Sequence, residues 1–308
     1  MYSLSDLVKG LQNPKLAARE MNILYHSRLG RRPYHPDGVD VVAEDWDNLV
    51  ILDACRYDVF EQYHTFEDGR LEHRISKACG TPVFLEANFG GRTLDDTVYV
   101  NCNPMFEDGE KYDAQFFKVV NLWETDWDDE ERTVLPEVAT ERAIEVSQEF
   151  PDKRLIVHFD QPHQPFIPSE REYSRHGPGK GDADEGMHRS FWYKMMTGEM
   201  DLDRETIWND YVANFEHALP AVKKLVDTLG GKTVITADHG NMIGERGYPI
   251  PVREWGHWGP QFYDPLVKVP WYVIDGERRD IVAEDVEEKE AVDGEEVKKK
   301  LRDLGYAP

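Results

Sequence analysis

The 308-residue sequence predicts an α/β protein with a central, mainly parallel sheet and helices on both faces. The first observation is a series of apolar runs, bounded by acidic or turn residues, that are typical of buried strands: 48–53, 97–100, 154–160, 233–238 and 269–274. The second is helical periodicity between these runs, in 136–149 and 208–229. Strands that alternate with helices favour parallel pairing, because the helix carries the chain back across the sheet.

The sequence predicts three parts around this sheet. Residues 1–47 are expected to form a helical segment that packs on the core, with an amphipathic helix over 3–26 and a break at Pro14. Residues 48–276 contain all the predicted strands, and 277–308 form a charged tail with a short helix over 294–305. The stretch 168–198 is rich in Gly, charged and aromatic residues, and predicts either a substrate-facing lid or a surface loop.

The composition is strongly acidic, with 60 acidic against 36 basic residues and a formal net charge of −24. Such a surface is expected to repel nucleic acid and anionic membranes. A site for an anionic ester would then need local positive charge from metal ions or basic side chains. Pervasive acidity with a mean hydropathy of −0.64 also predicts a halophilic protein, because salt screens the repulsion between surface charges.

The three cysteines, Cys55, Cys79 and Cys102, have no CxxC spacing and predict no disulfide framework. The N-terminus lacks a basic stretch followed by an apolar one, and no run approaches the roughly 20 apolar residues of a membrane span. We therefore expect a cytoplasmic protein without a membrane span, and its oligomeric state is open.

Three of the predicted strands end in an aspartate, namely Asp53, Asp160 and Asp238. Ligands of an open parallel sheet bind beyond the carboxyl ends of its strands. Each aspartate alone is better explained as a helix cap. The three together, with His163 and His239 close behind two of them, predict a metal site at this edge of the sheet.

Two of these strand ends resemble the alkaline phosphatase and sulfatase superfamily. The segment 236–247, TADHGNMIGERG, is similar to the strand of these enzymes that ends in Asp-His-Gly. This resemblance implies that Asp238 and His239 are metal ligands. The segment 49–58, LVILDACRYD, looks like the first strand of the family, and implies that Asp53 binds the same metal.

Two further segments extend the resemblance. Residues 157–166 are similar to the Pro-His-x-Pro-aromatic segment of the family, which implies that Asp160 binds metal and that His163 binds metal or substrate. In 255–260, His257 stands where two-metal members supply a last histidine ligand; the alternative is a histidine within an aromatic cluster. The resemblance implies one or two divalent cations, with zinc or manganese favoured and magnesium or calcium possible.

The window 76–82 follows the first strand and is the natural place for the nucleophile of the family. Thr81, next to Pro82, resembles the threonine nucleophile of the phosphodiesterase and phosphoglycerol-transferase branches, which a metal activates. Cys79 lacks the Pro and Arg context that sulfatases need to form formylglycine. It is the backup nucleophile, with an inert core cysteine as the alternative.

Two basic residues are candidates for contacting an anionic substrate. Arg56 offers a bidentate contact to an anion, although an ion pair with Asp58 is the alternative. Lys77 lies near the predicted nucleophile, although most lysines are solvated surface residues.

The resemblance covers roughly 48–274, makes 48–276 the catalytic domain, and implies a metal-dependent hydrolase or transferase that cleaves a phosphate or sulfate ester of a small molecule or glycan. The alternative is a metal-stabilised, non-catalytic module that binds sulfated or phosphorylated glycans.

Overall fold

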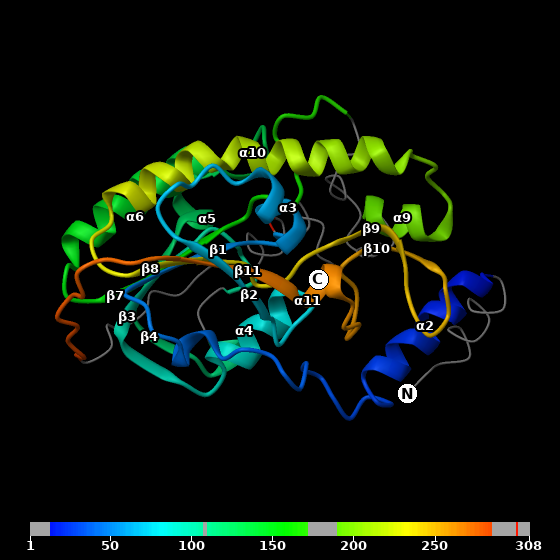
Figure 1. Ribbon diagram of the computed structural model, residues 1–308, viewed down its shortest axis with the longest axis horizontal. Helices are drawn as coiled ribbons and strands as arrows, with labels where there is room; N and C mark the ends of the chain where they lie inside the picture. The colour runs from blue at the N-terminus through cyan, green and yellow to red at the C-terminus, as the bar shows by residue number, and fades with distance from the viewer. Residues whose placement is uncertain (1–12, 107–109, 172–189, 285–299, 301–308) are drawn as a thin grey trace.

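The computed structural model describes residues 13–106, 110–171, 190–284 and 300. Its centre is a seven-stranded sheet with the order β2-β11-β8-β1-β7-β3-β4 (Figure 1). The strands are β1 (Asn48–Leu52), β2 (Arg70–Ile75), β3 (Thr93–Asn101), β4 (Gln115–Asn121), β7 (Arg154–Phe159), β8 (Thr233–Thr236) and β11 (Lys268–Ile274). This sheet, with its surrounding helices, confirms the predicted fold class.

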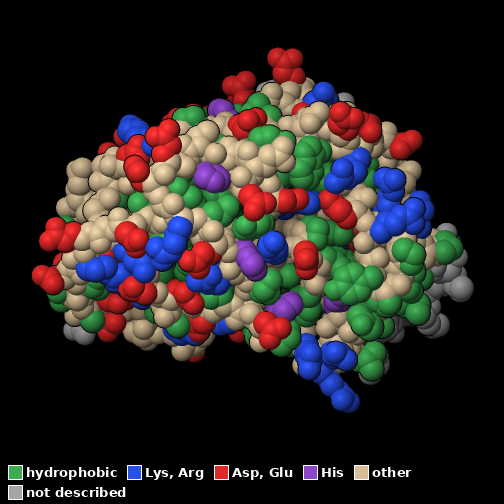
Figure 2. Space-filling view, in the orientation of Figure 1, with side chains coloured by type: hydrophobic (Ala, Val, Ile, Leu, Met, Phe, Trp, Pro, Cys, Tyr) green, Lys and Arg blue, Asp and Glu red, His purple; other side chains and the backbone are tan. Residues whose placement is uncertain are grey.

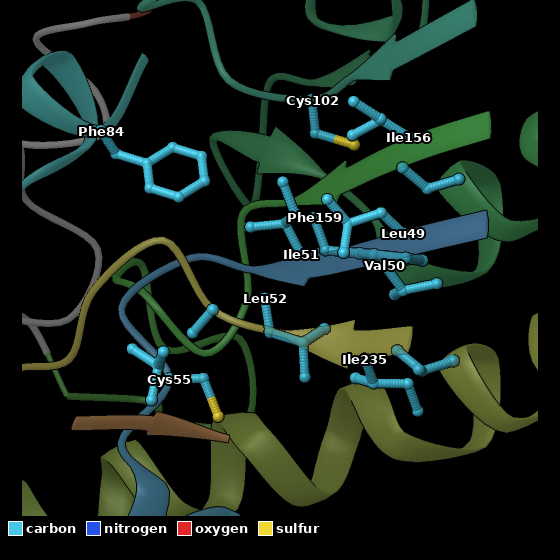
Figure 3. Packing of buried hydrophobic residues seen from close by; sticks show 14 of the residues in the cluster. Leu49, Val50, Ile51, Leu52, Cys55, Phe84, Cys102, Ile156, Phe159 and Ile235 are labelled. Atoms are coloured by element: carbon cyan, nitrogen blue, oxygen red, sulfur yellow. The ribbon is translucent and has the colours of Figure 1, made fainter. Parts of the chain in front are cut away.

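Strand β1 forms the middle of the core. All five of its residues are buried, as expected for a strand with both faces covered. Figure 3 shows Leu49, Val50, Ile51 and Leu52 along this strand, with Phe84 approaching from a helix beyond the sheet. Because β1 pairs in parallel with both β7 and β8, the carboxyl ends of these three strands lie side by side.

The sheet is mainly parallel, and β11 is the exception. It pairs antiparallel with both β8 and β2. The hydrophobic pattern of 269–274 predicted a buried strand there and carried no information on its direction.

Helices cover both faces of the sheet (Figure 1). On one side lie α6 (Pro136–Glu149) and α10 (Arg204–Thr228), which pack against each other. On the other side lies α4 (Thr81–Phe89). The two helices expected from periodicity are thus confirmed, and α10 begins four residues before the predicted 208, where the Asp203 side chain accepts a hydrogen bond from the backbone of Thr206. Short helices α3 (Tyr57–Tyr63) and α5 (Leu122–Thr125) follow β1 and β4.

The described N-terminal part is the helix α2 (Pro14–His26). The expected break at Pro14 is instead the start of this helix. Proline fits the first turn because the N–H that it lacks has no partner within the helix there. The remainder of the expected helix over 3–26, the helix over 294–305 and most of the 168–198 excursion lie outside the described residues.

Smaller elements complete the described chain. Strands β9 (Met242–Arg246) and β10 (Arg253–Gly256) form an antiparallel pair, as do β5 (Trp127–Asp128) and β6 (Thr133–Val134). The helix α9 (Phe191–Thr197) packs near β10, and α11 (Asp264–Val267) leads into β11. In the described part of the chain, no helix has both the length and the apolar character that crossing a bilayer requires.

Candidate metal centre and active site

The carboxyl ends of β1 and β8 bring two aspartates together. Asp53 follows the last residue of β1, and Asp238 lies two residues beyond the end of β8 with His239 next to it. All three side chains are fully buried, and one ligand atom from each lies within 4.8 Å of the others. Carboxylate oxygens with an imidazole nitrogen are a donor set for a divalent cation.

The structure places Thr81 against this group. Thr81 is the first residue of α4, and its side chain is fully buried. Its Oγ1 lies 2.8 Å from Asp238 Oδ2, 3.3 Å from Asp53 Oδ2 and 3.3 Å from His239 Nε2. A residue that is distant in sequence thus contacts all three candidate ligands.

Three histidines lie in a row beside Thr81. The ring centroids of His239 and His257 are 4.5 Å apart, and those of His257 and His163 are 5.1 Å apart. Nδ1 of His239 lies 2.7 Å from the carbonyl oxygen of Gly240, and Nδ1 of His163 lies 2.6 Å from that of Gln164. A carbonyl only accepts hydrogen bonds, so Nδ1 carries a proton in both rings, which makes Nε2 the ring atom that can bind a metal.

The electrostatics of the site favour a bound cation. Burial, then the neighbouring Asp238 and Asp160, raise the pKa of Asp53 well above its usual value. Burial lowers the pKa of His163 to about 4 and, with the other two histidines, lowers that of His257 well below its usual value. The imidazoles of His163 and His257 are therefore neutral at pH 7 and provide no positive charge to offset the crowded carboxylates. The residues present thus fit a divalent cation.

Asp160 lies beyond β7, outside the compact group. Its Oδ2 accepts a hydrogen bond from Thr133 Oγ1 at 2.9 Å, and burial raises its pKa to about 8. Oδ1 of Asp160 has no hydrogen-bond partner among the described residues. Its role as a metal ligand stays a prediction, as does that of His257.

The two basic candidates have partners within the protein. The Arg56 guanidinium lies 2.7 Å from carboxylate oxygens of both Asp58 and Glu245, so the structure shows the ion-pair alternative. Lys77 Nζ lies 3.4 Å from Asp40 and donates to the carbonyl of Ala87. A substrate contact of either residue stays a prediction.

Cys79 has the environment of an inert thiol. The side chain is buried, its thiol donates to the carbonyl of Gly259, and burial raises its pKa to about 11. A thiol with this pKa is protonated at neutral pH and is a poor nucleophile. This supports Thr81 over the backup candidate.

Three residues that the sequence reasoning missed lie around the site, and two of them hold it in place by hydrogen bonds. Asn103, beyond the end of β3, donates from Nδ2 to Asp53 Oδ2 at 2.7 Å. His158, within β7, lies 4.0 Å from Asp238 Oδ2. The Tyr211 hydroxyl of α10 donates to the carbonyl of Ala54 at 2.6 Å and accepts from the backbone N–H of Arg56 at 3.0 Å. These two hydrogen bonds fix the turn after Asp53.

A pocket with a volume of about 310 Å³ adjoins the site. Gly80, His163 and His257 contribute to its wall, so it leads toward Thr81. Its other described lining residues are mostly apolar: Pro33, Cys79, Pro82, Val83, Gln164, Trp192, Trp258, Gly259 and Pro260. No acidic or basic side chain stands among these described residues. Positive charge for an anionic ester therefore has to come from a cation or from outside this wall.

No family model and no curated protein matches the chain. Among solved structures, it is similar to the C-terminal periplasmic domain of EcEptC from Escherichia coli in complex with Zn, with 14% identity, a TM-score of 0.49, and coverage of 75% of this chain and 72% of that one. A 2-O GAG sulfatase has 12% identity, a TM-score of 0.47, and coverage of 75% and 64%. A protein in the alkaline phosphatase superfamily from Vibrio parahaemolyticus has 11% identity, a TM-score of 0.42, and coverage of 85% and 70%.

Proposed function

We propose that the protein is a metal-dependent enzyme that cleaves a phosphate or sulfate ester, with Thr81 as the nucleophile. The observation that carries this proposal is the position of the Thr81 hydroxyl, within 3.3 Å of Asp53, Asp238 and His239 at once. A buried hydroxyl next to two carboxylates and an imidazole is the arrangement that metal-assisted nucleophilic catalysis needs.

Asp53, Asp238 and His239 would hold the cation, next to the Thr81 hydroxyl. A bound divalent cation supplies a Lewis acid that polarises the ester and lowers the pKa of the hydroxyl. The mixed carboxylate and imidazole set favours zinc or manganese over the all-oxygen preference of magnesium and calcium. Asp160 and His257 are the candidates for binding a second cation.

The protein side chains account for the proton movements. The carboxylate of Asp238 lies 2.8 Å from Thr81 Oγ1 and accepts its proton. Oγ1 then attacks the phosphorus or sulfur in line, the bond to the alcohol breaks, and the leaving oxygen takes up the proton from Asp238. In the second step, water or an acceptor alcohol displaces Thr81 and gives its proton to Nε2 of His163 or His257, which passes a proton to Thr81 Oγ1 and restores the hydroxyl. The choice between water and alcohol decides between hydrolysis and transfer.

The alternative is a metal-stabilised module that binds phosphorylated or sulfated glycans without turnover. It has the same metal ligands but assigns no chemistry to Thr81. The two functions therefore differ in turnover and agree in metal content.

The test is to purify the protein in high salt, measure its metal content, and assay a phosphate monoester, a phosphodiester and a sulfate ester with added Zn²⁺ or Mn²⁺. We expect stoichiometric metal and turnover of one ester class. Metal without turnover, together with binding of a phosphorylated or sulfated glycan, would favour the binding module. Absence of both metal and turnover would refute the proposed function.

A further inference from the structure

The segment 13–33, which comprises α2 and the loop after it, differs in charge from the rest of the molecule. It contains five basic residues and one acidic residue, a formal charge of +4, whereas the whole chain carries −24. The remainder of the chain therefore carries −28. This segment is the exception to a surface that otherwise repels anions.

The same segment exposes a row of apolar side chains. Met21, Tyr25 and Leu29 follow one another at intervals of four residues and are 59%, 53% and 75% exposed. Tyr248, which contacts α2 through the ring of His26, is 51% exposed. These four account for all but one of the large hydrophobic side chains that are exposed in the described parts of the chain.

Basic side chains border this row. Figure 2 shows hydrophobic side chains gathered where Figure 1 places α2, with a group of Lys and Arg side chains beside them. Arg28, Arg31 and Arg32 are exposed, and the described residues include no acidic partner for any of them. By contrast, Arg19 on the inner side of α2 pairs with Glu254 at 2.8 Å. The three outer arginines are thus available to an anionic partner.

We infer that this face, made of residues 13–33 with 248–250, binds to the surface of a lipid membrane that carries anionic headgroups. A helix that presents apolar and aromatic side chains bordered by arginines lies in the interface, with the apolar row among the acyl chains and the arginines at the headgroups. Each basic residue near an anionic surface contributes about 1 kcal/mol. The row also borders a groove with a volume of about 540 Å³, which leaves the apolar surface open to a partner.

The docking face is attached to the proposed active site. Arg19 donates to the carbonyl of Trp258 at 3.2 Å, and Ile23 packs closely on Gly259, so α2 holds the segment that carries His257. Pro33 directly follows the arginines and lines the pocket beside Thr81. If the proposed function holds, this placement favours an ester on an amphiphile as the substrate. Docking itself does not depend on that function.

The experiment measures co-sedimentation of the full chain with vesicles of phosphatidylcholine, alone or mixed with phosphatidylglycerol. The ionic strength is about 0.15 M, where a Debye length of about 8 Å screens the distant acidic surface. We expect binding to the mixed vesicles and much weaker binding to phosphatidylcholine alone. Replacing Arg28, Arg31 and Arg32 together by Gln should weaken binding by about 100-fold. Replacing Met21 and Leu29 by Ser should weaken it by at least about 10-fold.

Matched variants separate this face from general effects of charge and hydrophobicity. Val282→Ser removes an apolar side chain that is 43% exposed outside the face. Replacing Arg70, Arg142 and Arg204 by Gln removes three exposed arginines that have acidic partners. Both controls should leave vesicle binding unchanged.

No sedimentation of the native protein with either vesicle, or an equal loss of binding in the controls, would overturn the inference. A native dimer that the Met21 and Leu29 substitutions convert to a monomer, without vesicle binding, would assign the face to a second copy of this chain. The vesicle assay reads binding alone, so its outcome is independent of whether any ester is turned over.

Discussion

The two ends of strand β1 carry buried aspartates in opposite electrostatic surroundings. Asp47, before the strand, has a carboxylate that accepts the backbone N–H of Lys232 at 2.8 Å and pairs with Arg278 at 3.1 Å. The pKa of Asp53, after the strand, is raised by burial and then by the nearby Asp238 and Asp160. Both side chains are fully buried.

The difference in surroundings indicates that Asp47 stabilises the fold and that Asp53 serves the proposed function. At the amino end of the strand, the protein provides its own positive charge, so the aspartate stabilises the fold. At the carboxyl end, Asp53 lies beside the Thr81 hydroxyl and the Asn103 amide, and the nearby Asp238 and Asp160 add negative charge. Under the proposed function, a bound cation compensates this charge, and the chemistry lies at the carboxyl end.

The largest expected effect comes from removing the proposed nucleophile at the carboxyl end of β1. Thr81→Val keeps the side-chain shape and should lower kcat by at least about 10³-fold, because the attacking oxygen is lost. The control is Thr140→Val, which removes a buried hydroxyl that donates to Ala221 far from the site. Steady-state kinetics on the ester class that the assay under Proposed function identifies measures both. Equal activity of the two variants would remove Thr81 from the mechanism.

The next effect concerns the orientation of Asp53. Asn103→Ala removes the 2.7 Å hydrogen bond to its carboxylate and should weaken metal binding by about 10- to 100-fold, as for other groups that orient metal ligands. Asn88→Ala, which removes a buried amide that bonds the backbone of Val41 and Phe84 and none of the candidate ligands in the described contacts, serves as the control. Metal titration by calorimetry measures the affinity, and an unchanged value in the Asn103 variant would contradict the assignment.

A smaller effect appears in the pH dependence of the metal-free protein. Burial raises the pKa of Asp160 to about 8 in the folded protein. The stability that this shift contributes is fully present below the pKa of Asp160 in the unfolded chain and is lost as pH rises through 8. The depressed pKa values of His158 and His163, about 4, act in the opposite direction and only below pH 6.5. Between pH 6.5 and 8, the free energy of unfolding should therefore fall by about 1–2 kcal/mol.

Asp160→Asn should make this dependence weaker than in the native protein, because the amide retains the hydrogen bond from Thr133 and does not ionise. The raised pKa of Asp53 contributes the slope that remains. Chemical denaturation at several pH values in the presence of a chelator gives the measurement. An identical slope in the native protein and the variant would show that Asp160 does not contribute.

The smallest effect tests the comparison directly. In metal-free protein, Asp53→Asn should raise the free energy of unfolding, because it removes one of several crowded carboxylates. Asp47→Asn should lower it by about 1 kcal/mol, because it removes the ion pair with the half-exposed Arg278. Thermal unfolding of both variants gives the sign. The same sign for both would mean that the two ends of β1 do not differ.

The sequence predicted the strands that are buried on both faces. Strands β1, β7 and β8 are continuous apolar runs, and the aspartates that follow them were recognised for that reason. Strand β2, with the sequence RLEHRI, lies at the edge of the sheet with mixed exposure and has no such pattern. The antiparallel direction of β11 depends on how the chain enters it from α11, which periodicity does not report.

For the site, the sequence identified the residues that carry distinctive chemistry and missed those that support them. Asn103 follows β3 just as Asp53 follows β1, so the rule that polar residues collect beyond parallel strand ends would have found it. Tyr211 lies in a long amphipathic helix, where the sequence pattern indicates only that an aromatic residue packs in the hydrophobic core. Its role depends on the position of the hydroxyl, which only the folded structure shows.

The crowded carboxylates also bear on how the protein reaches its folded state. Under the proposed metal binding, a cation that binds the native chain and not the unfolded one shifts the folding equilibrium by mass action, by about 2.7 kcal/mol at 100 times its Kd. Asp53, Asp238 and His239 come from strands that lie adjacent only after the sheet has formed. The yield of folded protein would then follow the supply of free metal in its surroundings, so that metal availability controls the amount of this protein as well as its activity.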